Sequence, residues 1–255
     1  MAGIAFGLQT YTPALFPKSI LAVPPGKHTT ALESTKAILA AFDEDLADEN
    51  QDVKLLGIFT VAGDAWAASK DLSTLAGLSG SKVVPFAAMT SPIFEAWGAV
   101  PVQMPVTEMY TGLSSGTIDG TSISASQLTP PWSFGEVSSH YIDNIPVSFA
   151  VFFVAMNKER YQELSDEHRA IIDEVSGLPF SMELARAFHL ADEAALKWKD
   201  EKIASGELNV EWIVATKEER SRMEAAATEG MAEIYADYAE RGIPNAQEIY
   251  EALNK

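Results

Sequence analysis

Patterns typical of strands and patterns typical of helices alternate along this chain from one end to the other, without a repeat or a low-complexity segment. The strand candidates are Ile4–Leu8, Lys54–Val61, Lys82–Phe86, Val100–Met104, Thr117–Ile123, Val147–Met156 and Val210–Val214. Strands that alternate with helices favour crossover units that pack helices against a sheet. The sequence therefore predicts an α/β fold.

Helix start signals support this order. Thr30 with Glu33, and Thr216 with Glu219, have the spacing of a capping box, in which two residues satisfy each other's backbone amides. Pro179 begins a helix of roughly 25 residues, judged from its apolar period. Its predicted apolar stripe comprises Leu184, Phe188, Ala191, Ala195 and Trp198. A helix of that length can span two lobes of a protein.

Charge and composition exclude several classes of partner and cofactor. The chain has 255 residues, a formal net charge of -18 and no cysteine. This negative field repels nucleic acids and anionic lipid surfaces, and the absence of thiols excludes disulfides and thiolate metal sites. The apolar stretch Ile145–Met156 is shorter than the roughly 20 residues of a membrane helix. The first residues lack the pattern of a signal peptide, so we expect any export signal outside this chain.

One motif could carry catalysis. Gly112 to Gly116 matches G-x-S-x-G, which would make Ser114 the nucleophile of a serine esterase, with a histidine and an aspartate elsewhere in the chain. That motif needs a strand before the serine and a helix after it, whereas here the order is reversed. The alternative interpretation is that Gly116 ends a helix. The four histidines are scattered, no phosphate-binding loop occurs, and neither a metal nor a cofactor is predicted.

The stretch Trp97–Gly120, WGAVPVQMPVTEMYTGLSSGTIDG, resembles a signature of the DctP-type periplasmic solute-binding proteins of tripartite ATP-independent (TRAP) transporters. In that family a Leu-Gly-Ala-x-Pro-Val-x-Met-Pro run precedes a short helix and a Gly-x-x-Asp-Gly turn. Phe153–Lys158 resembles the family's strand that ends in Asn-Lys, and Leu164–Ile172 resembles its following helix. Gly3–Pro24 is similar to its opening segment.

The resemblance implies a two-lobed, Venus-flytrap fold with a long helix that spans both lobes. Residues 1–82 would form a first lobe that lacks its N-terminal part, residues 83–147 the second lobe, and residues 148–255 a return to the first. We expect an exposed sheet edge on the incomplete lobe. The implied function is the periplasmic capture of a small organic solute, a carboxylate or a related polar compound, for membrane permease subunits. An enzyme, nucleic-acid binding and membrane insertion are not implied.

The residues that we expect to line the cleft are Tyr11, Thr90, Thr121, Ser122, Ser124 and Trp132. For the hydroxyls the alternative is a local turn or cap bond, and for the aromatic side chains it is core packing. The family carries a carboxylate-binding arginine where this chain has Val84, so the resemblance implies a cleft without that arginine. Lys82 is expected in solvent, and Asp119 is expected to position a turn. A serine esterase and a partner-binding module remain alternative functions.

Overall fold

Two β-sheets organise the computed structural model, which describes residues 2–5, 17–42, 46 and 53–254. The antiparallel three-stranded sheet has the order β1 (Ala2–Ala5), β8 (Ser148–Asn157), β2 (Val53–Gly63). The mixed six-stranded sheet has the order β5 (Val100–Pro101), β4 (Lys82–Val84), β6 (Gly120–Ile123), β3 (Ala65–Ala68), β7 (His140–Asp143), β9 (Glu211–Val214). The predicted two-lobed α/β fold is confirmed.

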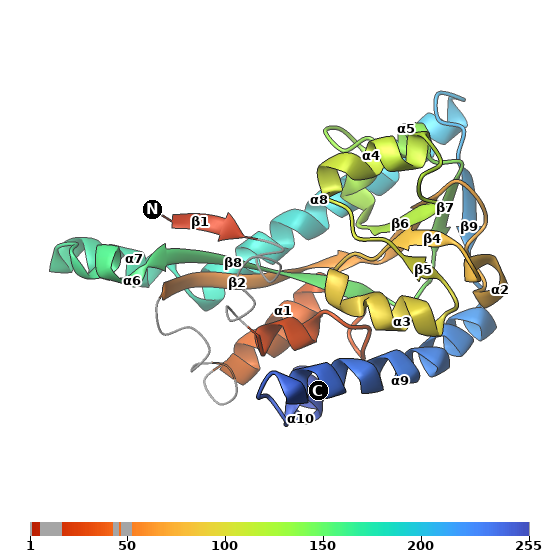
Figure 1. The fold of residues 1–255 in the computed structure, drawn as a ribbon. Helices are drawn as coiled ribbons and strands as arrows, with labels where there is room; N and C mark the ends of the chain where they lie inside the picture. The colour runs from red at the N-terminus through yellow and green to blue at the C-terminus, as the bar shows by residue number, and fades with distance from the viewer. Residues whose placement is uncertain (1, 6–16, 43–45, 47–52, 255) are drawn as a thin grey trace.

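The helices are α1 (Ala31–Ala41), α2 (Leu75–Leu78), α3 (Ser91–Ala96), α4 (Val106–Ser114), α5 (Phe134–Val137), α6 (Lys158–Gln162), α7 (Asp166–Val175), α8 (Leu178–Ala204), α9 (Lys217–Glu240) and α10 (Ala246–Leu253). Three 3-10 turns, η2 (Ser19–Ala22), η4 (Ala88–Thr90) and η5 (Ala125–Leu128), complete the described elements. In Figure 1 the α6 and α7 helices lie beyond the far ends of the long pair β2 and β8.

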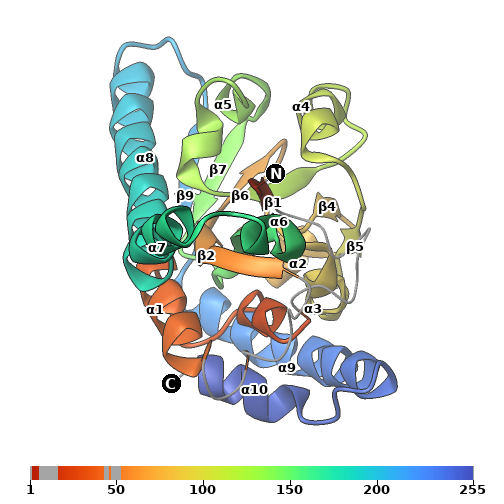
Figure 2. The same ribbon diagram turned by 90° about the vertical axis from the view of Figure 1, so that its left-hand side faces the viewer.

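Within the described residues, three connections lead from a strand of one sheet to a strand of the other. The chain leaves β2 at Gly63 and enters β3 at Ala65, and it returns from β7 to β8 between Asp143 and Ser148. The third is α8, which packs on α1 and β2 of one half and on η5 of the other; Figure 2 shows it along one side of the molecule. Sheet membership thus changes near residues 64 and 145, and the lobe boundaries at 82 and 147 stay predictions.

The start and stop signals of the helices are confirmed with one modification. Thr30 accepts a hydrogen bond from the Glu33 amide, and the Glu33 side chain accepts from the Thr30 amide, which completes the capping box. At Thr216 the structure shows only the first half, a bond from the Glu219 amide. Gly116 ends α4 with a φ of 71°, a conformation that favours glycine.

The buried face of α8 contains four of the five residues of the predicted stripe, namely Leu184, Phe188, Ala195 and Trp198. Ala191 is exposed, and the helix turns Asp192 and Lys199 inward together with Ala185 and Ala195. The prediction followed apolar residues alone, so it missed the two charged side chains that lie on the same side of the helix. An inward carboxylate on a helix that crosses both halves marks a position other than ordinary core.

Short strands escaped prediction or were predicted too long. β3 consists of alanines and one tryptophan, a composition with low strand propensity, and tertiary pairing with β6 and β7 fixes it. β4 ends at Val84, short of the predicted Phe86, because Pro85 has no amide to donate to the ladder. Of the predicted strand Ile4–Leu8, residues 4 and 5 belong to β1 and the remainder lies outside the described residues.

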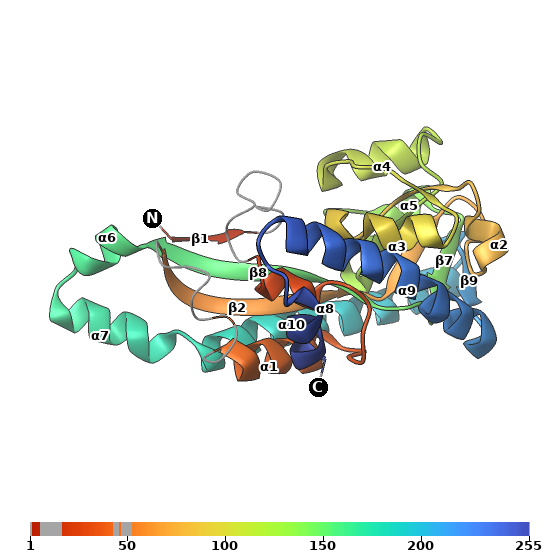
Figure 3. The same cartoon turned by 60° about the horizontal axis from the view of Figure 1, so that its bottom comes forward.

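The two faces of β3 bury two different cores. Trp66 and Ala68 contribute to a large cluster that also includes residues of α3, α9, η2 and α10, whereas Ala65 and Ala67 contribute to a second cluster with α4. This alternation is the period of two expected of a strand buried on both faces. Figure 3 shows α9 and α10 on the side that also carries α3, and the first cluster therefore joins the helices of both halves.

Candidate functional site at the junction of the sheets

Two of the predicted cleft residues make local contacts. The Thr90 side chain is fully buried in η4 and donates a hydrogen bond to the Ala87 carbonyl oxygen at 2.7 Å. Trp132 is partly buried and packs against the second core cluster. Tyr11 lies outside the described residues. A ligand contact by any of these three residues stays a prediction.

Three of the predicted residues lie together at the end of β6. Thr121 is buried, and its hydroxyl donates to the Val84 carbonyl oxygen at 3.3 Å. Ser122 pairs with Trp66 of the neighbouring strand β3. Ser124 follows the strand and caps η5, with its Oγ 2.9 Å from the Ser126 Oγ. These contacts are local or within the sheet, but they bring Ser124 to the point where the chain crosses between the halves.

Asp64 occupies the first crossing. Ala65 pairs with Ile123 in antiparallel register, so one further step along both strands places Asp64 beside Ser124. The residue as a whole is partly exposed, yet its Oδ1 is enclosed and has no hydrogen-bond partner among the residues that the structure describes. A buried, unpaired acceptor is costly, and it is found where a ligand or a proton supplies what the protein omits.

Each crossing contributes one carboxylate to the same region, which we call the acidic junction: Asp64, Asp143 and Asp192. Asp143 ends β7 and accepts a hydrogen bond from the Asn144 amide at 2.6 Å. Asp192 projects from α8 and accepts one from the Ser126 amide at 2.8 Å. Asp64 therefore differs from the other two, because its enclosed oxygen lacks such a donor.

The electrostatics follow from this geometry. Burial raises the pKa of Asp64 from 3.8 to about 7, and repulsion by Asp192 and Asp143 adds to that effect. Burial also raises the pKa of Asp192, opposed by its hydrogen bonds from Ser126 and Ser124. Burial and the same three carboxylates raise the pKa of the Tyr141 hydroxyl. The junction thus holds more negative charge than its immediate surroundings neutralise.

A phenylalanine cluster includes Phe188, which lies one turn of α8 from Asp192. Phe59, Phe152 and Phe188 lie in mutual ring contact, with centroids 5.3 to 5.8 Å apart. Phe188 precedes Asp192 by four residues on α8, so the two side chains share one face of that helix. Gly63 lies so close to Phe86 that a Cβ would come within 2.6 Å of its ring. The junction therefore combines a carboxylate oxygen that has no donor among the described residues with the partly exposed ring of Phe188 beside Asp192.

The bacterial extracellular solute-binding protein family 7 model matches residues 31–238, which include every described strand except β1. The chain belongs to this family. One curated relative, the outer membrane transporter protein TsaT of Comamonas testosteroni, is 26% identical over 188 residues, 71% of this chain and 54% of the relative. This family 7 protein thus spans about half the length of that relative.

Solved structures of TRAP solute-binding proteins share the fold. A marine metagenome protein specific for aromatic acid ligands, crystallised with metahydroxyphenylacetate, has a TM-score of 0.85 and 22% identity, covering 99% of this chain and 78% of that one. A Rhodoferax ferrireducens protein with copurified benzoate has a TM-score of 0.84 and 24% identity over 99% and 77%. The ectoine-binding protein of Halomonas elongata has a TM-score of 0.75 and 18% identity over 99% and 80%.

The position predicted to replace the family arginine is part of the core in this family 7 protein. Val84 is 3% exposed, belongs to the second hydrophobic cluster and pairs with Thr121 in the sheet. Lys82 is exposed, as predicted. Asp119 accepts a hydrogen bond from the Lys82 amide at 2.7 Å, which supports its predicted positioning role.

The esterase interpretation lacks its structural context. Ser114 is the last residue of α4 and is exposed, so a helix precedes it, contrary to the strand that a nucleophile elbow requires. Within the described ranges, no three side chains are grouped to hold a metal ion. The helices of that same part of the chain include none long and apolar enough to cross a membrane.

Asp64 supplies a test of the electrostatics in the absence of any ligand. Its folded-state pKa lies above the ordinary value, so the folded state binds the extra proton and stability falls as the pH rises from about 4 to about 7. Asp64→Asn should therefore stabilise the protein by about 2 kcal/mol at pH 8, after a discount for partial exposure, and by much less near pH 4. Urea unfolding at both pH values measures this.

The matched control is Asp166→Asn, which removes the same charge from a side chain that is 95% exposed. An equal change in unfolding free energy at both pH values for Asp64→Asn would contradict a raised pKa.

Proposed function

We propose that this protein captures a small organic solute between its two halves and presents it to the membrane permease subunits of a TRAP transporter. The observation that carries the proposal is the family 7 match over residues 31–238, on a chain whose two sheets are joined by three crossings. Two halves joined by so few connections can change their relative orientation around a ligand. The location that fits this role is the periplasm.

The solute class proposed is a small polar organic compound. Relatives of the same fold bind aromatic acids, benzoate and ectoine, and the partly exposed rings of Phe152 and Phe188 offer apolar surface that suits such solutes. With Val84 buried in the core, a bidentate guanidinium grip on a carboxylate has no donor at that position. We propose that Ser122, Ser124 and Trp132 contact the solute, with Tyr11, Thr90 and Thr121 as further candidates.

A binding role, rather than catalysis, is part of the proposal. The family is one of solute-binding proteins, and Ser114 lies on the exposed end of α4. A fluorophosphonate probe should therefore leave Ser114 unlabelled, and stoichiometric labelling would favour the esterase.

Capture between two halves predicts a change of shape on binding. Native mass spectrometry of the purified protein identifies a copurified solute, and small-angle scattering then compares the solute-free and the reloaded protein. We expect the radius of gyration to fall by about 1 Å on reloading, because a ligand that touches both halves favours the closed arrangement. A solute that binds tightly without compaction would contradict closure, and a protein that binds no small molecule would contradict capture.

A further inference from the structure

We propose that the captured solute carries a protonated nitrogen, an ammonium or amidinium group, and that the Asp64 carboxylate receives it at the acidic junction. This inference rests on the proposed function of solute capture and specifies the chemistry of the solute. It starts from an oxygen: the Asp64 Oδ1 is enclosed, yet no described residue donates a hydrogen bond to it. A ligand that donates a hydrogen bond there would complete the site.

The charges around Asp64 favour a cation over any other donor. Asp143 faces it from β7 and Asp192 from α8, and both are carboxylates that repel a second negative charge. Ser124 and Ser126 turn their donors toward Asp192, which leaves them committed. A positively charged solute group would be attracted by all three carboxylates, whereas a solute carboxylate would be repelled by them.

The basic side chains described near the junction have other partners. His189 lies one turn from Asp192 on α8 and 3.7 Å from Glu193. Lys199 is buried against the Trp212 ring and pairs with Asp200 at 2.9 Å. Within the described part of the chain, neither makes a hydrogen bond to Asp64. Among the described residues none supplies a positive charge to Asp64, and we infer that the ligand does.

A metal ion is a poorer occupant than an organic cation. The three aspartates do not form a group that could hold a metal, judged over the described residues. The ring of Phe188, one turn of α8 from Asp192, and the neighbouring ring of Phe152 are partly exposed. Such rings suit the hydrocarbon part of an organic ammonium ion, since they also attract cations across their faces. The structure thus provides for both ends of an aralkyl or alkyl ammonium solute.

Protonation of Asp64 determines the direction in which the affinity for the solute changes with pH. A bound cation keeps the carboxylate ionised, so binding expels a proton and tightens as the pH rises through about 7. A solute that instead accepts a hydrogen bond from protonated Asp64 would bind more weakly at higher pH. Tyr141 on β7 and Asp192 on α8 also face the site, but the pKa of the tyrosine is raised above its ordinary value and Asp192 is held by hydrogen bonds.

The experiment compares matched pairs of probes by thermal shift and then by calorimetry: benzylamine with benzoate, phenethylamine with phenylacetate, and butylamine with butyrate. We expect at least one amine to bind, with the dissociation constant about fivefold to tenfold lower at pH 8 than at pH 6, as a group of pKa near 7 dictates. Asp64→Asn should weaken that amine at least tenfold, while Asp166→Asn, at an exposed position, leaves its affinity unchanged. Calcium chloride at equal concentration tests the metal.

The outcomes separate this inference from the proposed function. Binding of the carboxylates with unchanged affinity in Asp64→Asn would overturn the cation and leave solute capture standing. Stabilisation by calcium that Asp64→Asn abolishes, without binding of any amine, would replace the organic cation by a metal. If an amine binds with the same affinity at pH 6 and pH 8, and with the same affinity to Asp64→Asn, the proposed role of Asp64 would be wrong. If none of the probes binds, the result would count against the inference and against solute capture as well.

Discussion

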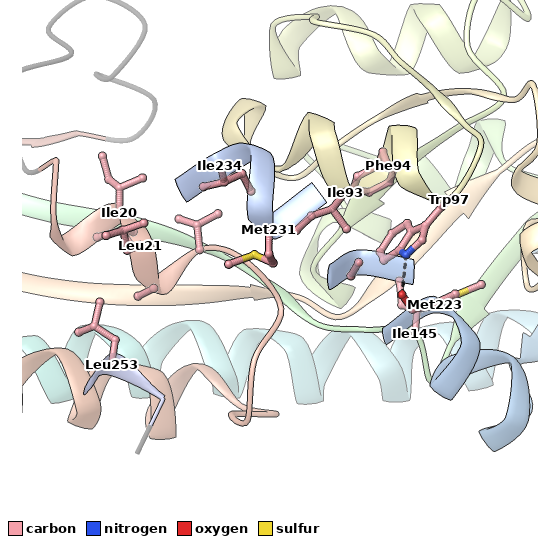
Figure 4. Packing of buried hydrophobic residues seen from close by; sticks show 14 of the residues in the cluster. Ile20, Leu21, Ile93, Phe94, Trp97, Ile145, Met223, Met231, Ile234 and Leu253 are labelled. Atoms are coloured by element: carbon pink, nitrogen blue, oxygen red, sulfur yellow. Dashed lines mark hydrogen bonds between the residues drawn. The ribbon is translucent and has the colours of Figure 1, made fainter. Parts of the chain in front are cut away.

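Replacing Trp97 with alanine is expected to lower the free energy of unfolding by about 4 kcal/mol, the scale of losing a large buried aromatic side chain. Trp97 is 3% exposed, and its ring centroid lies 4.9 Å from that of Phe94 and 5.9 Å from that of Trp66. Its indole nitrogen donates a hydrogen bond to the Met223 carbonyl oxygen at 2.7 Å (Figure 4). The side chain therefore ties α3 to α9 by packing and by a hydrogen bond.

Two further variants separate these contributions. Trp97→Phe retains a ring but leaves the Met223 carbonyl without its donor, so we expect a loss of about 2 kcal/mol. Val100→Ala, at a side chain that is 49% exposed, should change the free energy of unfolding by less than about 0.5 kcal/mol. Urea unfolding midpoints provide the measurement. A loss at Trp97→Ala as small as that at Val100→Ala would refute the tie between α3 and α9.

Gly230→Ala should destabilise the protein by about 2 kcal/mol or more, although the same change in an exposed helix would stabilise it by about 1 kcal/mol. Gly230 lies in the middle of α9, where a Cβ would come within 2.6 Å of the backbone atoms of Pro92 and Ile93 in α3. Backbone atoms cannot rotate away as a flexible side chain would. The missing side chain thus permits the close crossing of the two helices.

The control is Glu229→Ala, which changes an exposed residue of the same helix and leaves the crossing untouched. Its free energy of unfolding should stay within about 0.5 kcal/mol of the parent protein. A gain in stability at Gly230→Ala, measured under the same conditions, would mean that α3 and α9 are farther apart than the structure has them.

Local signals in the sequence predict local structure well. The capping box at Thr30 and the long strands β2 and β8 were all predicted from caps and hydrophobic runs, because those features act over a few residues. The order of strands in the six-stranded sheet was not, since β3 pairs with β6 and β7 from far along the chain. Pairing of that kind depends on the whole fold.

The candidate site shows the same division. Ser124 was predicted from its place after an expected strand, and it does lie beside the crossing. Asp64 and Asp192 were missed, because each looks like an ordinary surface carboxylate until the register of β3 and the rotation of α8 are known. A signal existed for Asp192: it follows Phe188 by four residues, so an acidic side chain lies on a face that is otherwise apolar.

The connection after β2 and the connection before β8 meet the three-stranded sheet at the same residue pair, since Gly63 pairs with Ser148. A hinge at that residue pair would let one half rotate relative to the other without breaking the hydrogen bonds between the strands of the sheet. The α8 helix, 27 residues or about 40 Å long, packs on both halves. It would have to bend when the two halves change their relative orientation. The bending stiffness of α8 would then limit the opening angle between the two halves. The distance between Asp192 and Asp64 would change with that angle.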